Sequence, residues 1–238
     1  MKKRIYKAEK KMILYCDDII CASEKLRSKF EEISPRDRKI HLISVIADNS
    51  SFQKSNLTEY LRWDKIPAPK AVIFGKISHR INFDLIERLS MRIPDMSIVF
   101  IGKILDKRFK RLLRNYQNIY HLGFLSRDKI IYCLRSATVG LHPGKKLIFN
   151  EYSNPIRIYE YAAAGIPIVA INISRESDYP KTISVVDNDN GFITAVENRF
   201  KHGVTDNEKS ELVKFSEKHS ASEIVNAHIR VFQAAISA

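Results

Sequence analysis

The sequence NPIRIYEYAAAGIPIVA, residues 154–170, predicts the start of a helix. It also places an arginine near that start, where a positive charge is unfavourable. Asn154 is a suitable N-cap, Pro155 is favoured at the first helical position, and Gly165 is a natural C-terminal stop. Arg157 then falls in the first turn, where the helix dipole opposes positive charge. Free N–H groups at a helix start attract anions, and arginine suits phosphate oxygens. Arg157 therefore either binds an anion or extends to solvent or to a surface carboxylate.

From about residue 68 onward, short apolar runs alternate with amphipathic segments. Strands are expected in the ranges 71–77, 97–104, 118–125, 138–143, 166–172 and 182–186, with helices in 81–93, 106–116, 126–137 and 154–164. Strands that are apolar throughout are typical of parallel sheets buried between two layers of helices. The pattern predicts an α/β fold with a doubly wound parallel Rossmann-like sheet, in which ligands bind beyond the carboxyl ends of the strands.

The first part of the chain has a different pattern. DDIICASEKLRSKF predicts a strand that runs into a helix, and KIHLISVIAD predicts another strand. Residues 49–70 resemble a connector, with Pro67 and Pro69 near its end. Two such pieces are too few for a Rossmann-like domain of their own, so they indicate the edge of something larger.

The composition describes a basic globular protein of 238 residues with a net charge of +13. No apolar run approaches the roughly 20 residues of a membrane span, and the N-terminus does not have the pattern of a signal peptide. Cys16, Cys21 and Cys133 fit neither a CxxC motif nor a disulfide framework, so we expect reduced cysteines and a cytoplasmic protein.

Two basic clusters account for much of the charge: Lys2, Lys3, Arg4, Lys7, Lys10 and Lys11, and Lys103, Lys107, Arg108, Lys110, Arg111 and Arg114. Such a balance favours anionic partners, although a solvated basic face explains each cluster equally well. No RNP-type, zinc-finger or KH-type motif is present, so nucleic acid is not expected as a partner.

The segment 154–170 resembles the nucleotide-sugar motif of retaining GT-B glycosyltransferases of the group 1 type, Pro-Ile-Lys-Leu-x-Glu-Tyr-x-Ala-x-Gly-x-Pro-Val-Val. Residues 71–104 and 118–143 resemble the two donor-domain stretches that precede this motif in the family, in the same order. The resemblance implies a remnant of the N-terminal acceptor domain with its linker in 1–67, a nucleotide-sugar donor domain in 68–205, and C-terminal helices in 206–238.

The resemblance also implies roles for individual residues. Glu160 would bind the ribose hydroxyls, and the backbone of Asn154, Pro155 and Ile156, with Arg157, would hold the diphosphate. The remaining implied residues are Gly75 and Lys76 at the phosphates, Arg80 as a further cation, Phe124 and Leu125 at the base, and His142 and Gly144 near the donor sugar. Lys76, Arg80, Arg157 and Glu160 would act in catalysis. Glu160 also suits an early helical turn without any ligand, and Phe124 and Leu125 also suit a core.

Enzymes of this kind use side chains in place of a metal ion, so we expect no metal and no cofactor besides a UDP- or GDP-sugar substrate. Asp187 and Asp189 in VVDNDNG are interpreted as a turn. The family's usual first glutamate is replaced by Tyr152, and Lys76 stands where the family has arginine. Ile81 falls near the place of the family's lysine, for which Arg80 could substitute.

Three functions remain open at this stage. The first is sugar transfer to a glycan or lipid-linked acceptor in envelope or capsule polysaccharide synthesis, with peripheral contact at the inner face of the membrane. The second is a catalytically incomplete nucleotide-sugar-binding subunit that needs a partner chain to supply the acceptor domain. The third is another α/β nucleotide-binding protein such as an epimerase, against which the absence of GxGxxG counts.

Overall fold

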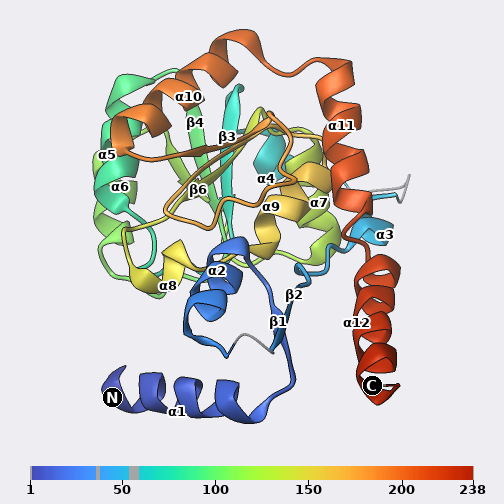
Figure 1. Ribbon diagram of the computed structural model, residues 1–238. Coiled ribbons are helices and arrows are strands. Elements are labelled where there is room, and N and C mark those ends of the chain that lie inside the picture. Colours follow the sequence, from blue (N-terminus) through green and yellow to red (C-terminus); the bar gives the residue numbers. More distant parts are fainter. Residues whose placement is uncertain (1, 36–37, 54–58, 238) are drawn as a thin grey trace.

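A computed structural model describes residues 2–35, 38–53 and 59–237. Its centre is a six-stranded parallel sheet with the strand order β5-β4-β3-β6-β7-β8 (Figure 1). The strands are β3 (Lys70–Phe74), β4 (Ser97–Ile101), β5 (Ile119–His121), β6 (Val139–Pro143), β7 (Ile168–Ile171) and β8 (Ile183–Val186). This order confirms the predicted doubly wound sheet, and its winding direction reverses between β3 and β6.

Helices cover both faces of the sheet, which explains why its strands are apolar on both sides. Ala71 and Ile73 of β3 belong to one core cluster, and Val72 and Phe74 belong to the other. The first cluster includes residues of α5 (Phe83–Arg92), α6 (Phe109–Asn115) and α10 (Asp189–His202). The second includes residues of α7 (Arg127–Arg135), α9 (Ile156–Ala163) and α11 (Asp206–Glu217).

Shortly after each of three strands lies a glycine with a positive φ angle. Residues that carry a side chain rarely adopt such an angle. These are Gly75 after β3, Gly102 after β4 and Gly123 after β5, with φ of 109°, 140° and 77°. Gly75 N donates to Ile101 O at 2.8 Å, and Gly102 N donates to Gly123 O at 2.7 Å. A Cβ atom on Gly102 would lie 2.0 Å from Gly75 O. The backbones of neighbouring strands therefore approach closely at the edge where ligands bind.

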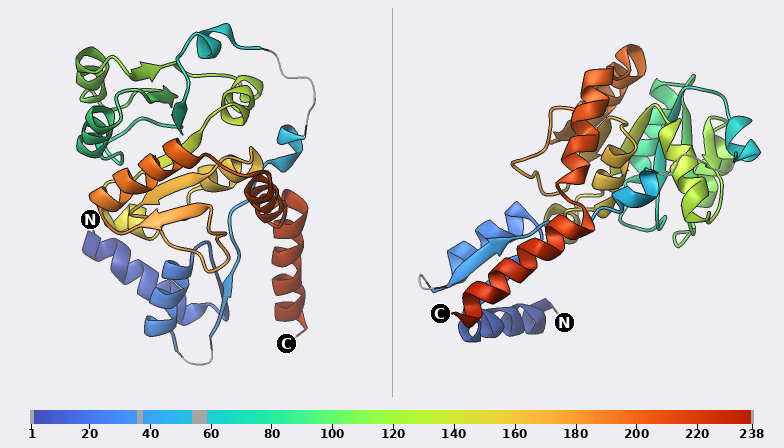
Figure 2. Two further views of the ribbon diagram at one scale, coloured as in Figure 1. Left: turned by 90° about the horizontal axis from the view of Figure 1, so that it is seen from above. Right: turned by 90° about the vertical axis from the view of Figure 1, so that its right-hand side faces the viewer.

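The N-terminal unit consists of α1 (Lys2–Tyr15), β1 (Asp18–Cys21), α2 (Glu24–Ile33) and β2 (Lys39–Leu42). β1 and β2 form a separate two-stranded parallel sheet, which confirms the predicted strand–helix–strand order. The helix α1 was not predicted. In Figure 2 this unit and α12 (Ala221–Ile236) project from the same side of the larger sheet.

The segments that join these parts are more ordered than the sequence suggested. The predicted connector contains two short helices, α3 (Asn49–Phe52) and α4 (Leu61–Asp64), while residues 54–58 of it lie outside the described residues. The short helix α8 (Ile148–Glu151) follows β6. The predicted turn at Asp189 is wrong, because Asn188 caps a helix that starts there. The division of the chain after residues 67 and 205 stays a prediction.

We expect Gly102→Ala to lower the free energy of unfolding by more than about 3 kcal/mol, because the new methyl group would overlap the carbonyl of Gly75. Gly123→Ala is the matched control, since Gly123 has positive φ but no atom within 4 Å of the place where the new methyl group would lie. It should cost only about 1–2 kcal/mol. Urea denaturation of both variants measures the difference, and equal losses would contradict the close approach.

Candidate nucleotide-sugar site

Two adjoining cavities lie at the carboxyl ends of the strands around the switch between β3 and β6. The first has a volume of about 610 Å³ and is lined by seven of the predicted residues, namely Lys76, Arg80, His142, Gly144, Asn154, Pro155 and Arg157. The second, of about 440 Å³, is lined by the predicted Gly75, Phe124 and Leu125 and by Ile101 and Ile130. Lys76 and Leu105 line both cavities. A cationic cavity therefore continues into an apolar one, an arrangement that suits a diphosphate joined to a base.

Arg157 lies at the second position of α9 and lines the first cavity. It forms no hydrogen bond or ion pair with any described residue, so it is not paired with a surface carboxylate. Its guanidinium packs against Gly75, where an added Cβ atom would lie 2.9 Å from Nη2. Burial lowers the pKa of Arg157, while Tyr161 and Glu160 raise it. An arginine remains charged under such a shift, so the cavity holds a partly buried cation without a counter-ion.

His142 lies on β6 and lines the same cavity. Burial lowers its pKa well below the ordinary value, and the nearby positive charge of Arg157 lowers it further. Its Nδ1 atom is buried and has no hydrogen-bond partner among the described residues. His142 is therefore a neutral ring at pH 7, and its buried Nδ1 atom is unpaired among the described residues.

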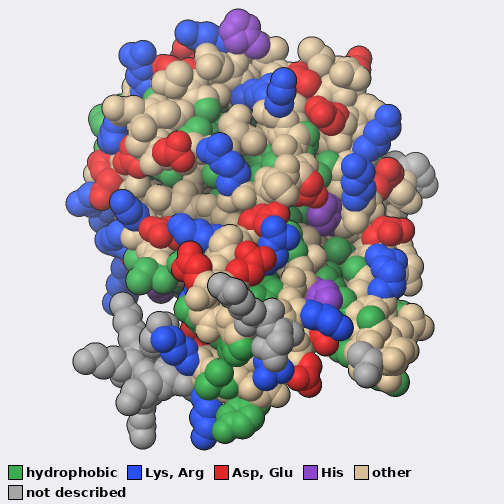
Figure 3. Space-filling model, viewed as in Figure 1, with side chains coloured by type: hydrophobic (Ala, Val, Ile, Leu, Met, Phe, Trp, Pro, Cys, Tyr) green, Lys and Arg blue, Asp and Glu red, His purple; other side chains and the backbone are tan. Residues whose placement is uncertain are grey.

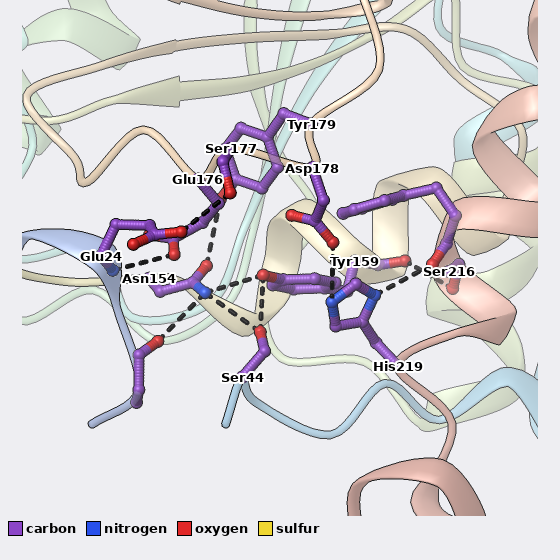
Figure 4. Close-up of polar contacts among 12 residues, drawn as sticks. Glu24, Ser44, Asn154, Tyr159, Glu176, Ser177, Asp178, Tyr179, Ser216 and His219 are labelled. Atoms are coloured by element: carbon purple, nitrogen blue, oxygen red, sulfur yellow. Dashed lines mark hydrogen bonds and ion pairs between the residues drawn. The ribbon is translucent and has the colours of Figure 1, made fainter. Parts of the chain in front are cut away.

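The prediction that Asn154 caps α9 is wrong, because Pro155 occupies the N-cap position and long-range contacts engage the Asn154 amide. Figure 4 shows these contacts. Its Nδ2 lies 3.1 Å from Ala22 O, 3.1 Å from Ser44 Oγ and 2.7 Å from Tyr159 Oη, and its Oδ1 accepts from Tyr179 Oη at 3.0 Å. The side chain therefore joins the N-terminal unit to α9, and only the backbone of Asn154 is left for a ligand.

Glu160 is buried and lines neither cavity. Its Oε1 accepts a hydrogen bond from the guanidinium of Arg127, and no described residue donates to its Oε2. Burial raises the pKa of Glu160, and the charge of Arg127 opposes that shift. The contact of Glu160 with a ribose stays a prediction. One of its carboxylate oxygens already accepts a hydrogen bond from Arg127. The sequence analysis did not single out Arg127. Its partner Glu160 lies 33 residues later in the chain, and the residues around Arg127 give no sign of that contact.

The remaining predicted residues lie at the edges of the site. Arg80 is exposed, with its guanidinium carbon 3.8 Å from the centroid of the Phe149 ring. Ile156 is 49% exposed and lines neither cavity. In 2–35, 38–53 and 59–237 no three His, Cys, Asp or Glu residues form a group that could hold a metal ion, and no helix is long and apolar enough to cross a membrane. The expectation of metal-independent chemistry stays a prediction.

The sheet order defines an α/β domain of the Rossmann-like class. Solved structures agree with this fold at low sequence identity. Sucrose-phosphate synthase from Thermosynechococcus elongatus superposes with a TM-score of 0.75 at 13% identity, over 96% of this chain and 61% of that one. The pneumococcal O-GlcNAc transferase GtfA, in complex with UDP and GlcNAc, gives a TM-score of 0.61 at 12% identity, over 92% and 45%.

Sequence comparison identifies the family. Residues 70–223 match the family described as "Glycosyl transferases group 1". The Bacillus subtilis (strain 168) protein named "Putative teichuronic acid biosynthesis glycosyltransferase TuaH" is 23% identical over 189 residues, which cover 76% of this chain and 46% of that protein. The chain belongs to the group 1 glycosyltransferase family and has the C-terminal, Rossmann-like half of a GT-B fold. It spans less than two thirds of each of these three proteins.

The depressed pKa of His142 predicts a pH-dependent loss of stability. Below about pH 6.5, the unfolded chain binds a proton at this ring that the folded chain excludes, so stability falls as pH decreases toward the folded-state pKa. Between pH 7.5 and 5.5 the wild type should lose about 1.4 kcal/mol more than His142→Gln. Urea denaturation at both pH values tests this, and parallel losses in the two proteins would show that the ring titrates normally.

Proposed function

We propose that the chain binds a UDP- or GDP-sugar and contributes to transferring its sugar to a glycan or lipid-linked acceptor in envelope or capsule polysaccharide synthesis. The observation that carries this proposal is Arg157, a partly buried cation without a counter-ion beside Gly75 and the neutral His142. The family match and the name of the Bacillus relative support it. The protein would act in the cytoplasm, at the inner face of the membrane.

The proposed chemistry follows from where the charges lie. Cleavage of a sugar–diphosphate bond builds negative charge on the leaving diphosphate, and fixed cations and N–H groups stabilise that charge in the transition state. Arg157, Lys76 and Arg80 line the cavity and would supply the positive charge. The first N–H groups of α9 add to it, because they have no intrahelical acceptor. A metal ion would then be unnecessary.

Transfer also needs an acceptor site. The N-terminal unit offers a two-stranded sheet, and the curated relative is about twice the length of the matched region. An acceptor domain would therefore come from a further part of the protein or from a partner chain.

Calorimetric titration with UDP, GDP, UDP-glucose and GDP-mannose, without added metal, tests donor binding. We expect one nucleotide series to bind, and Arg157→Ala to weaken that binding by roughly tenfold or more, because a buried charge–phosphate contact is lost. Arg157→Lys keeps the charge and should be affected less.

Arg88→Ala is the matched control for that titration, because this exposed arginine pairs with Asp189 away from both cavities. It should bind like the wild type. Absence of binding to every nucleotide by the folded wild type would refute the proposed function. Equal weakening by Arg88→Ala would refute the role of Arg157.

A ribose contact of Glu160 makes a separate prediction. The wild type should bind a nucleoside diphosphate more tightly than its 2′,3′-dideoxy analogue, by roughly tenfold, because the carboxylate would accept hydrogen bonds from both hydroxyls. Glu160→Ala should bind the two ligands equally. Arg127→Ala serves as the control for loss of the ion pair alone, and it should keep part of the preference. If Glu160→Ala retains the full preference, the ribose is recognised elsewhere.

A further inference from the structure

An ion pair between Arg127 and Glu160 joins two helices beside the two cavities. Arg127 is the first residue of α7, Glu160 lies in the middle of α9, and the guanidinium donates to Oε1 of the carboxylate. Residues three apart on a helix share a face. Ile130, three residues after Arg127, lines the apolar cavity, and Arg157, three residues before Glu160, lines the cationic one. The ion pair therefore lies close to both cavities.

The carboxylate of this ion pair is buried, unlike most charged groups of the molecule. Figure 3 shows Lys and Arg side chains interspersed with Asp and Glu side chains over the visible face. Water screens such exposed pairs, so they contribute little to stability. In contrast, 10% of the Glu160 side chain and 31% of the Arg127 side chain are exposed. A carboxylate this buried needs a fixed partner to stay charged.

Asp48 holds the guanidinium of Arg127 from another side. Asp48 Oδ2 lies 3.3 Å from Arg127 Nε, and the centroid of the Phe52 ring lies 5.2 Å from the guanidinium carbon. Asp48 is itself fixed as the N-cap of α3, because its Oδ1 accepts from Ser51 N at 3.3 Å and its Oδ2 accepts from Ser51 Oγ at 2.6 Å. The guanidinium is therefore held between the carboxylates of Asp48 and Glu160, which belong to different parts of the chain.

The charge of Glu160 depends on these neighbours. Burial raises the pKa of Glu160, and the positive charges of Arg127 and Arg157 lower it. The negative charge of Asp48 raises it further. α11 also packs on α9, but none of its described residues forms an ion pair with Glu160. Without Arg127, the buried carboxyl would therefore bind a proton at a higher pH, and it would lose the charge that strengthens hydrogen bonds from hydroxyl groups.

We propose that Arg127 is a positioning residue for nucleotide recognition: it fixes one oxygen of Glu160 and leaves the other to accept hydrogen bonds from a ribose. This inference rests on the proposed function, because it serves the predicted ribose contact. A glutamate side chain that binds a ligand loses rotational freedom. Because Arg127 holds Oε1 before the ligand arrives, part of that loss has already occurred in the free protein. In this role Arg127 acts through Glu160 and does not itself contact the ligand.

Carbon-13 NMR titration of the Glu160 carboxyl in the ligand-free full chain is the first test, with the signal assigned by its absence in Glu160→Gln. In Arg127→Ala this carboxyl should bind its proton roughly tenfold or more tightly than in the wild type, because burial then acts without the opposing charge. Arg127→Gln also lacks the charge and should behave alike, so it serves if the alanine variant does not fold. An unchanged proton affinity would overturn the proposal.

Arg135→Ala is the matched control for this titration. Arg135 lies two turns from Arg127 on α7, and its guanidinium donates to the backbone oxygen of Phe52 in α3. The variant therefore removes another contact between α7 and α3 but leaves the partner of Glu160 in place. The proton affinity of Glu160 should stay within about twofold of the wild type. An equal change in both variants would show that loosening α7 is sufficient, and would overturn the specific role of Arg127.

The pH dependence of ribose recognition is the second test. It compares the binding of UDP or GDP with that of the 2′,3′-dideoxy analogue. Between pH 8.5 and 6.5 the preference of the wild type should change by less than about twofold, whereas that of Arg127→Ala should fall by roughly threefold or more as its Glu160 takes up a proton. Titration of the diphosphate cancels, because both ligands carry it. A merely structural role of Arg127 would lower the preference equally at both pH values, which would overturn the proposal.

The two tests also separate this proposal from the proposed function. If the folded wild type binds no nucleotide, the proposed function fails and the ribose role of Arg127 fails with it, while the NMR titration still decides whether Arg127 keeps Glu160 charged. If nucleotides bind with a ribose preference that Arg127→Ala retains at both pH values, the proposed function stands and the positioning role fails.

Discussion

The side-chain amide of Asn154 fixes the position of the N-terminal unit on the α/β sheet. It is 8% exposed and bonds to both parts of the chain, through Ser44 on one side and Tyr159 on the other. A buried amide that loses its partners costs about 1–3 kcal/mol, so displacement of the unit is opposed at this point. Because Asn154 directly precedes α9, the same contacts hold the helix start that presents Arg157.

The proposed donor site combines this rigid support with unbalanced charge. Glu160 pairs with Arg127, whereas Arg157 forms no hydrogen bond or ion pair with a described residue. Leaving a partly buried cation unpaired is unfavourable in the folded protein, and the well-packed core of the sheet offsets that cost. Gly75 contributes in a different way, since the absence of its side chain makes room for the guanidinium. The cavity is thus arranged for a negative ligand before one arrives.

The sequence predicted the sheet well because its strands are short apolar runs between amphipathic helices, a pattern that depends on local residues alone. Most of the residues that the family resemblance implied line the two cavities at the switch point, but Glu160 and Ile156 line neither. The sequence analysis failed where a role depends on distant partners. Asn154 was interpreted as a local cap, although Ala22, 132 residues away, is one of its partners. Arg127 was missed for the same reason, and α1 was missed because its basic residues dominated its pattern.

The long separation between the bonded partners also has a consequence for synthesis. Ser23 bonds to a backbone oxygen 129 residues later, and the amide of Asn49 bonds to one 167 residues later. At typical translation rates, on the order of ten seconds pass between the synthesis of β1 and β2 and the synthesis of the segments that pack on them. During that time a lone pair of parallel strands exposes unpaired edges, which are prone to aggregate. Residues 18–49 should therefore need protection from aggregation until these later partners have been synthesised.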